Sequence, residues 1–331
     1  MRAAYMPGPG LLDVGDFPDP QPVSDGEVLV QMHYASVCGS DLHMLYDGLH
    51  REDMVGRPGY PGHEGVGAVL ESRSSDFPVG TPVLALPPGD AGGCFAELQV
   101  LDDAHLVALP TGGELPRLLM AQQLGTAVFA LKAFGRPAGG TAVVIGAGSA
   151  GLFFVQLLAQ RFEQVLVSDP HPGRLAVAER LGATPVRVPD ASLARAVAAA
   201  TGGAGADLVV ETAGLDACRA EAVDLIRSGG AVGCFGYPER VGLAPFPVQA
   251  AFRKAAAVHW VSGAQAEPGL CSFREAVRLV HEGEVEVDFC LQHTVGLEDA
   301  VAGVQVARAQ GAVVKIVVDL RASASRSDER N

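Results

Sequence analysis

Three side chains near the N-terminus offer the sulfur, nitrogen and oxygen ligands that zinc takes. Cys38 lies in the segment VCGSDLH (37–43), and His63 and Glu64 lie in PGHEGVG (61–67). Taken singly, each is more often a buried thiol, a structural histidine or a surface acid. Three protein ligands with a fourth position left open are the arrangement of a catalytic zinc site. The sequence therefore predicts a candidate metal site at these three residues.

A second chemical motif, IGAGSAG (145–151), follows an apolar run and precedes a segment with helical spacing. GxGxxG between a strand and a helix is typical of a dinucleotide-binding loop and is favoured here over a glycine-rich turn without a ligand. The first glycine permits the tight turn, the second lets the backbone approach a pyrophosphate, and the third lets helix and strand pack closely. The cofactor contacts predicted in this loop are Gly146, Gly148, Ser149, Ala150 and Gly151.

The next predicted strand ends at Asp169, about 20 residues beyond the loop. A carboxylate there accepts ribose hydroxyl protons and repels a 2′-phosphate, which favours NAD(H) over NADP(H). A solvated aspartate at a strand end is the alternative. Arg174 follows in the next helix and would stack on the adenine, unless it turns toward the 2′ position and weakens the preference.

Composition and charge narrow the class of protein. The 331 residues are 48% apolar and 19% charged, which suits a globular chain of two domains and excludes a disordered or collagen-like one. The net charge of −14 repels phosphate backbones and anionic membranes, so neither nucleic acid nor a membrane is an expected partner. The most apolar stretch, 142–159, contains glycines and predicts a strand, a turn and a helix start in preference to a membrane span.

The cysteines and the N-terminus indicate the compartment. Pro7 and Gly8 interrupt any apolar run that a secretory signal would need. Six cysteines are scattered without a CxxC pair, which argues against a disulfide framework and against a clustered zinc site. We therefore expect reduced thiols in a cytoplasm, and the scarcity of lysine beside abundant alanine, glycine and proline indicates a bacterial source.

The pattern of elements predicts an α/β protein of two domains. Short period-two runs between glycine and proline turns predict a barrel-like β domain near the N-terminus. Further on, apolar runs alternate with helical stretches, which predicts a parallel, doubly wound sheet. We assign 1–122 and 265–331 to a catalytic domain, with 321–331 a disordered tail, and 123–264 to a cofactor domain. The β runs are 27–32, 65–70 and 81–86; the parallel strands are 142–145, 165–168, 208–211 and 231–235; the helices are 118–134, 150–160, 174–181, 193–200, 217–226 and 272–282; a last pairing segment is 313–320.

In order and spacing, these motifs resemble the zinc-dependent medium-chain dehydrogenase/reductase family. CGSDLH, GHEGVG, GGCFAE (92–97) and the GxGxxG loop carry the resemblance, which spans residues 1 to about 320 and is nearest to the polyol, sorbitol and threonine dehydrogenases. It implies a GroES-like β-barrel catalytic domain, a Rossmann domain that binds NAD, and alcohol dehydrogenase activity.

The resemblance implies a role for each residue of the metal motifs. Cys38 and His63 would bind the catalytic zinc, and Glu64 would be the third ligand or alternate with a bound water. Asp41 would accept the other ring N–H of His63 and fix its tautomer.

The resemblance also implies a path for the substrate proton. Ser40 would hydrogen-bond the substrate hydroxyl at the zinc, and His43 would pass the proton to solvent. The zinc would lower the alcohol's pKa, so that hydride leaves toward the nicotinamide. Lys315 resembles a family position near the cofactor.

Two departures from the family pattern matter. Many relatives carry a four-cysteine structural-zinc lobe where this chain runs from Pro87 almost directly to Cys94, so we expect one zinc per chain and no structural zinc. Relatives also place a cysteine or glutamate ligand where this chain has Gln122, and an amide is a poorer zinc ligand.

Further residues are assigned to the cofactor and the substrate. ETAG (211–214) and GYP (236–238) follow later strands and would line the nicotinamide side, with ordinary turns as the alternative. The predicted contacts there are Thr212, Ala213, Gly236 and Tyr237, and the substrate-pocket candidates are Tyr46, Phe95 and Phe129.

The function that these expectations support is a zinc-dependent alcohol dehydrogenase that moves hydride between a secondary alcohol, polyol or cyclitol and NAD. A zinc-free, NADPH-dependent quinone or enoyl reductase of the same fold is one alternative, and a non-catalytic dinucleotide-binding protein is another. A homodimer or homotetramer, assembled through the cofactor sheet, is expected by analogy.

Overall fold

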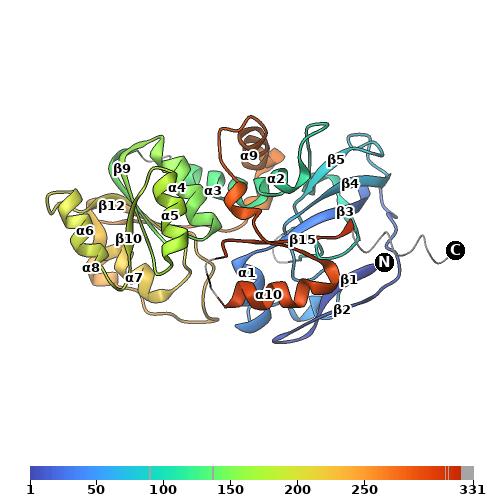
Figure 1. The fold of residues 1–331 in the computed structure, drawn as a ribbon, viewed down its shortest axis with the longest axis horizontal. Coiled ribbons are helices and arrows are strands. Elements are labelled where there is room, and N and C mark those ends of the chain that lie inside the picture. Colours follow the sequence, from blue (N-terminus) through green and yellow to red (C-terminus); the bar gives the residue numbers. More distant parts are fainter. Residues whose placement is uncertain (89–90, 136–137, 310, 312, 322–331) are drawn as a thin grey trace. The chain divides into compact units, whose positions relative to one another are not determined.

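The chain folds as two units, coloured along the sequence in Figure 1. The computed structural model describes residues 1–88, 91–135, 138–309, 311 and 313–321. One unit consists of Met1–Gly125 and Gly263–Asn331, and the other is Thr126–Ser262. The boundaries predicted at 122/123 and 264/265 lie close to these. The predicted disordered tail falls, apart from Arg321, outside the described residues.

The first unit is built on antiparallel strands. Its main sheet has the order β14-β15-β3-β4-β5-β7, with β6 also paired to β3, and β1 and β2 form a separate hairpin. The long central strand β3 buries most of its side chains, because neighbouring strands and helices cover it. The strands are β1 (Arg2–Gly8), β2 (Leu11–Asp16), β3 (Glu27–Val37), β4 (Gly65–Ser72), β5 (Pro82–Ala85), β6 (Leu98–Asp102), β7 (Leu106–Ala108), β14 (Thr294–Gly296) and β15 (Ile316–Asp319); the helices are α1 (Gly39–Tyr46), α2 (Leu115–Leu119), α9 (Cys271–His281) and α10 (Ala300–Arg308).

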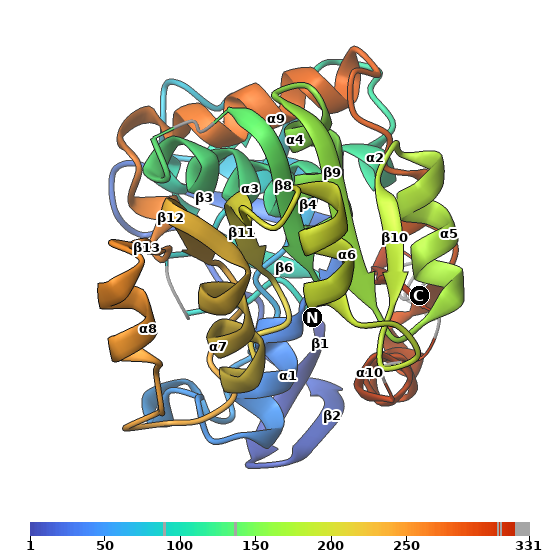
Figure 2. The same ribbon diagram turned by 90° about the vertical axis from the view of Figure 1, so that its left-hand side faces the viewer.

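The second unit is a parallel sheet of the order β10-β9-β8-β11-β12-β13, which Figure 2 shows strand by strand. The strand order reverses between β8 and β11, the point where a doubly wound sheet binds its ligand. The strands are β8 (Gly139–Ile145), β9 (Phe162–Asp169), β10 (Thr184–Arg187), β11 (Ala206–Glu211), β12 (Ile226–Cys234) and β13 (Ala257–Trp260); the helices are α3 (Ala121–Ala133), which contains the unit boundary, α4 (Ser149–Ala159), α5 (Pro172–Arg180), α6 (Leu193–Ala200), α7 (Asp216–Leu225) and α8 (Val248–Arg253).

Both faces of this sheet are buried. Val143 and Ile145 of β8 pack in one core cluster with residues of α6 and α7. Their neighbours Ala142 and Val144 are fully buried as well and point to the opposite face, because successive strand residues alternate. This explains the continuous apolar runs of the sequence, which are typical of parallel sheets covered on both sides.

The sequence missed β10 and β13. Each has four residues and lies at an end of the sheet, and β10 contains Pro185, a residue that strands tolerate at an edge. The predicted helix 118–134 is two helices in the structure, α2 and α3, separated at Met120. In the described ranges no helix is both long and apolar enough to cross a bilayer.

The pairing of β3 with β4 requires a residue without a side chain. A Cβ placed on Gly67 would lie 2.1 Å from the carbonyl oxygen of Gln31 in β3. We expect Gly67→Ala to lower the free energy of unfolding by about 1–3 kcal/mol, because the strand must shift to relieve the overlap. Urea denaturation measures it, with Gly8→Ala as the control because a Cβ there meets nothing within 4 Å. Equal stability of the two variants would contradict the argument.

Candidate functional site

Strand register brings the candidate metal ligands together. Val37, the last residue of β3, pairs with Ile316 of β15, and Ala35 pairs with Gly65, the first residue of β4. Cys38 and Glu64 therefore leave the same end of the sheet from adjacent strands. Lys315, which directly precedes Ile316, arrives at this end as well.

Cys38, His63 and Glu64 converge as the sequence predicts. One ligand atom from each lies within 4.8 Å of the other two. Glu64 is 1% exposed, and its Oε1 atom is buried without a hydrogen-bond partner in the described part of the chain. A buried, unpartnered carboxylate oxygen beside a thiol and an imidazole fits a metal ion, and sulfur, nitrogen and oxygen together suit zinc.

Asp41 orients two of the three ligands. It is fully buried in the first turn of α1, where its Oδ2 accepts the backbone N–H of Cys38 at 2.8 Å. Its Oδ1 lies 2.8 Å from Nδ1 of His63, which leaves Nε2 for the metal. Burial alone would lower the pKa of His63, but the Asp41 carboxylate outweighs it and holds that pKa well above its ordinary value.

The two predicted relay residues differ in their surroundings. Ser40 places its Oγ 3.3 Å from Nε2 of His63, beside the predicted metal position. His43 lies one turn further along α1, with Nδ1 2.7 Å from the exposed carboxylate of Asp47. The relay through Ser40 and His43 stays a prediction.

Sequence reasoning missed the partners that hold Glu64. Its Oε2 lies 2.6 Å from Nζ of Lys315, and Ser36 Oγ also donates to it. Both charged side chains are 1% exposed. Burial alone would raise the pKa of Glu64, but the Lys315 ammonium outweighs it and lowers that pKa. Lys315 therefore contacts the metal site, a role that its position in an apolar strand segment did not reveal.

Gln123, the neighbour of the predicted Gln122, lies beside the candidate metal ligands. Its Nε2 lies 3.8 Å from Sγ of Cys38, and its Oε1 accepts from Lys315 at 3.4 Å. Gln122 is also buried. Adjacent helix residues point about 100° apart, so a shift of one position in α3 decides which amide contacts the thiol.

The three substrate-pocket candidates lie in different surroundings. Phe95 is 1% exposed, and its ring fills the space a Cβ on Gly62 would take, so it packs beneath the loop that carries His63. Tyr46 is half-buried, with the guanidinium of Arg308 3.9 Å from its ring. Phe129 is half-buried in α3, in the other unit. Their contact with a substrate stays a prediction.

The dinucleotide loop has the packing that its glycines predict. A Cβ on Gly151 would lie 1.9 Å from the carbonyl oxygen of Gly146, and Gly146 itself has φ +100°. A Cβ on Gly148, the residue that precedes α4, would meet nothing within 4 Å. The hydroxyl of Thr212 donates to the carbonyl oxygens of Ile145 and Gly146. Open space over Gly148 beside a helix N-terminus fits a pyrophosphate.

Asp169 is fixed at the carboxyl end of β9. It is 4% exposed, and its two oxygens accept the backbone N–H groups of Ala147 and His171, each at 2.8 Å. An ionised carboxylate has about four acceptor positions, so two are left for ribose hydroxyls. Nη1 of Arg174 lies 3.9 Å from Oδ2, which fits either of the two orientations expected for this arginine.

The remaining predicted cofactor residues lie at neighbouring strand ends. Ser149 and Ala150 begin α4. Thr212 and Ala213 directly follow β11, while Gly236 and Tyr237 follow β12. All of these positions lie at the carboxyl edge of the parallel sheet, where doubly wound proteins bind ligands.

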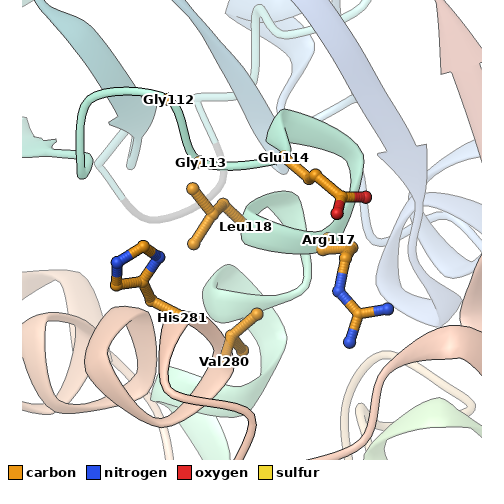
Figure 3. A pocket seen from close by; sticks show the side chains of 7 residues that line it. All are labelled: Gly112, Gly113, Glu114, Arg117, Leu118, Val280 and His281. Carbon is orange, nitrogen blue, oxygen red and sulfur yellow. The ribbon is translucent and has the colours of Figure 1, made fainter.

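Other features carry no predicted chemistry. Cys94 lies near the position where many relatives carry the structural-zinc lobe. It is buried, and its sulfur contacts Oε1 of Gln99. All six cysteines are free thiols. A surface hollow in the first unit lies between α2 and α9 (Figure 3) and contains none of the predicted site residues; it is lined by Gly112, Gly113, Glu114, Arg117, Leu118, Val280 and His281.

Comparison with known families agrees with the candidate metal site and with the dinucleotide loop, each in its own unit. Residues 24–111 match the alcohol dehydrogenase GroES-like domain, and residues 148–281 match the zinc-binding dehydrogenase domain. The matched regions include Cys38, His63, Glu64 and most of the dinucleotide loop.

Individual relatives extend over nearly the whole chain. A "Probable zinc-binding alcohol dehydrogenase" of Mycobacterium tuberculosis is 30% identical, over 94% of this chain and 86% of its own length. L-threonine 3-dehydrogenase of Bacillus velezensis is 26% identical, over 89% and 92%. The solved alcohol dehydrogenase of Thermus sp. ATN1 is 24% identical and superposes with a TM-score of 0.84 over 97% of this chain and all of that one, which shows a common fold.

The contact between Asp41 and His63 predicts a pH-dependent change in metal affinity. Zinc needs Nε2 of His63 free of a proton, so wild-type affinity should rise with pH until the raised pKa of His63 is passed. We expect Asp41→Asn to bind zinc about 10- to 100-fold more weakly at high pH, because the ring loses its orienting partner. The difference in zinc affinity between variant and wild type should narrow as pH falls. Without the Asp41 carboxylate the variant's His63 has a lower pKa, so protons displace zinc from it less readily than from the wild type.

Chelator competition at several pH values measures both effects. Asp47→Asn is the matched control, because Asp47 holds His43 on the exposed side of the same helix. A deficit equal in the two variants, or constant with pH, would show that Asp41 does not act through His63.

Proposed function

Because this chain belongs to the zinc-dependent medium-chain alcohol dehydrogenase family, an oxidoreductase family that acts on CH–OH groups, we propose that it oxidises a secondary alcohol or polyol to a ketone with NAD as hydride acceptor. The observation that carries the proposal is the cluster of Cys38, His63 and Glu64, the last two of them buried, in a chain that also has a glycine-rich loop with space for a dinucleotide. Each feature supplies one half of a dehydrogenase.

The metal half rests on residues that would hold a single zinc ion. Cys38, His63 and Glu64 would be its protein ligands, and Gln123 would donate to the Cys38 thiolate. Zinc held there would supply Lewis-acid chemistry, which lowers the pKa of an alcohol hydroxyl. We expect no structural zinc, because the four-cysteine lobe is missing from the sequence.

Proton movement falls to α1. Ser40 Oγ, beside His63 Nε2, is placed to accept the proton of a substrate hydroxyl and to give up its own. His43, hydrogen-bonded to Asp47, is half-buried and would exchange that proton with solvent. Asp41 would keep the His63 ring oriented throughout.

The cofactor half would bind NAD at the carboxyl edge of the parallel sheet. The pyrophosphate would lie over Gly148, and Asp169 would accept the adenosine ribose hydroxyls. The preference for NAD rests on the Asp169 carboxylate, since a second negative charge at the 2′ position would be repelled.

Assembly and location are further parts of the proposal. β13 is an end strand of the sheet, and Trp260 on it and Phe252 on α8 are exposed. An end strand with large apolar neighbours suits pairing with a second copy, so we propose a homodimer or a homotetramer. We also propose a cytoplasmic enzyme whose partners are small alcohols and ketones, and neither nucleic acid nor membrane.

The first experiment measures NADH absorbance with NAD and a panel of secondary alcohols, polyols and cyclitols, on native and chelator-stripped protein. We expect turnover on one substrate class that is lost on stripping and restored by zinc. Turnover that survives stripping would move the three ligands to structural roles. Reduction of quinones or enones with NADPH would favour the zinc-free reductase, and no turnover with any substrate would favour a non-catalytic binder.

A second prediction concerns cofactor choice. We expect Asp169→Asn to reduce the preference in kcat/KM for NAD over NADP about tenfold or more, because the repelling charge is removed while one side-chain oxygen remains as an acceptor. Asp190→Asn is the control, since Asp190 is exposed and forms an ion pair with Arg187, three residues away. An unchanged preference in Asp169→Asn would place the 2′ position away from this carboxylate.

A further inference from the structure

A buried arginine in the second unit takes no part in the function described so far. Arg219 lies in α7, on the side of the sheet that α6 and α7 cover, and is 4% exposed. A guanidinium is rarely buried unless its hydrogen-bonding groups find partners, so the contacts of Arg219 indicate its role.

The guanidinium of Arg219 joins two loops and a helix start. Nη2 donates to the carbonyl oxygen of Gly236 at 3.0 Å and lies 3.4 Å from that of Tyr237. Nη1 donates to Asp216 Oδ1 at 3.0 Å, at the start of α7. Nε lies 3.6 Å from Oε2 of Glu211, which is too long for a hydrogen bond but within ion-pair range.

Glu211 holds the other side of the same junction. It is fully buried as the last residue of β11, and its Oε1 accepts the backbone N–H of Gly214 at 2.6 Å. Its own carbonyl oxygen accepts the N–H groups of Phe235 and Gly236. One residue therefore contacts the loop after β11 through its side chain and the loop after β12 through its backbone.

The two loops are in close backbone contact. A Cβ on Gly214, where φ is +80°, would lie 2.2 Å from the carbonyl oxygen of Tyr237. A Cβ on Gly236 would lie 2.2 Å from the backbone nitrogen of Gly214. Thr212 in the first loop is in turn hydrogen-bonded to the turn at Gly146. The loops after β8, β11 and β12 thus form one connected surface at the carboxyl edge.

We infer that Arg219 is a positioning residue for the dinucleotide: by tying Gly236 and Tyr237 to Glu211 and Asp216, it sets the surface on which the nicotinamide end would lie. The inference rests on the proposed function, because it needs that cofactor at this edge. Arg219 itself contacts no reacting atom. It acts through the backbone of the loop after β12, so its loss changes cofactor binding and leaves the metal site of the other unit unaltered.

The geometry also distinguishes an arginine from a lysine at this position. A planar guanidinium donates to Asp216 and to the Gly236 carbonyl at the same time through two nitrogens. A lysine ammonium keeps the positive charge between Glu211 and Asp216 but lacks this forked pair of donors. Arg219→Lys therefore separates charge neutralisation, which folding requires, from loop positioning. Arg219→Met removes both and tests how far the buried carboxylates depend on the charge.

The chain provides its own reporter for the experiment. Trp260 is the sole tryptophan, it ends β13, and its ring centroid lies 5.8 Å from the Arg219 guanidinium. Tryptophan emission overlaps the absorption of reduced nicotinamide, so quenching of Trp260 by added NADH gives a dissociation constant on the purified full-length, zinc-loaded protein.

We expect Arg219→Lys to raise the Kd for NADH about tenfold, which corresponds to the loss of one or two hydrogen bonds to a charged group. The KM for NAD should rise with it, while zinc content stays unchanged. Arg240→Lys is the matched control, because Arg240 also pairs with Asp216, at 2.8 Å, but is half exposed and bonds otherwise to Glu239. It should bind NADH like the wild type.

Two outcomes would overturn the inference, and a third would overturn the proposed function on which it rests. In the first, Arg219→Lys and the wild type bind NADH with equal affinity, so the paired hydrogen bonds of the guanidinium only stabilise α7. In the second, Arg240→Lys is weakened as much as Arg219→Lys, so the effect runs through Asp216 alone. In the third, the wild type itself binds neither NADH nor NADPH; that failure belongs to the proposed function and is told apart because it appears before any substitution. If Arg219→Lys unfolds at a lower temperature but binds NADH normally when folded, the role is structural.

Discussion

The candidate metal site depends on the ion pair between Glu64 and Lys315. The Glu64 carboxylate is held between the Lys315 ammonium and the thiol and imidazole of Cys38 and His63. A carboxylate buried without a counter-charge is driven to protonate, and a protonated carboxyl is a poor metal ligand. Lys315 keeps it ionised and takes one of its oxygens, which leaves the other oxygen beside Cys38 and His63. Removing either partner would leave a buried charge uncompensated.

This pair also explains why the site needs the whole first unit. Glu64 precedes β4, Cys38 follows β3 and Lys315 precedes β15, so the three come together only after both pairings of β3 have formed. The C-terminal strand therefore completes a site whose ligands all belong to the first 64 residues. A metal site assembled in this way is coupled to folding, because the contacts that hold its ligand side chains do not exist in the unfolded chain.

The second unit follows a different constraint, which is close backbone approach. Gly146, Gly151, Gly214 and Gly236 each lie where a Cβ would overlap a neighbouring loop, so these loops pack backbone against backbone. Two buried charged side chains at this junction, Glu211 and Arg219, make hydrogen bonds that helices and strands cannot provide at their ends. Close backbone packing with hydrogen bonds between the loops favours a preorganised surface, which suits recognition of a flexible dinucleotide.

By itself, the sequence determined the fold class, the two-unit organisation, the candidate metal ligands and the dinucleotide loop. The helix at 193–200 has the bounds that its periodicity predicts, and the buried strands of the second unit were found because continuous apolar runs mark strands covered on both faces. β10 and β13 escaped notice, because a strand with one neighbour buries too little to leave a pattern. Only the tertiary structure decided that Gln123 contacts Cys38, that Lys315 and Ser36 hold Glu64, and that Arg219 joins the loops. The physical reason is that ligands and loop glycines are recognised by type and local spacing, whereas their supporting contacts come from residues far apart in the chain, whose partners are set by strand register and helix rotation.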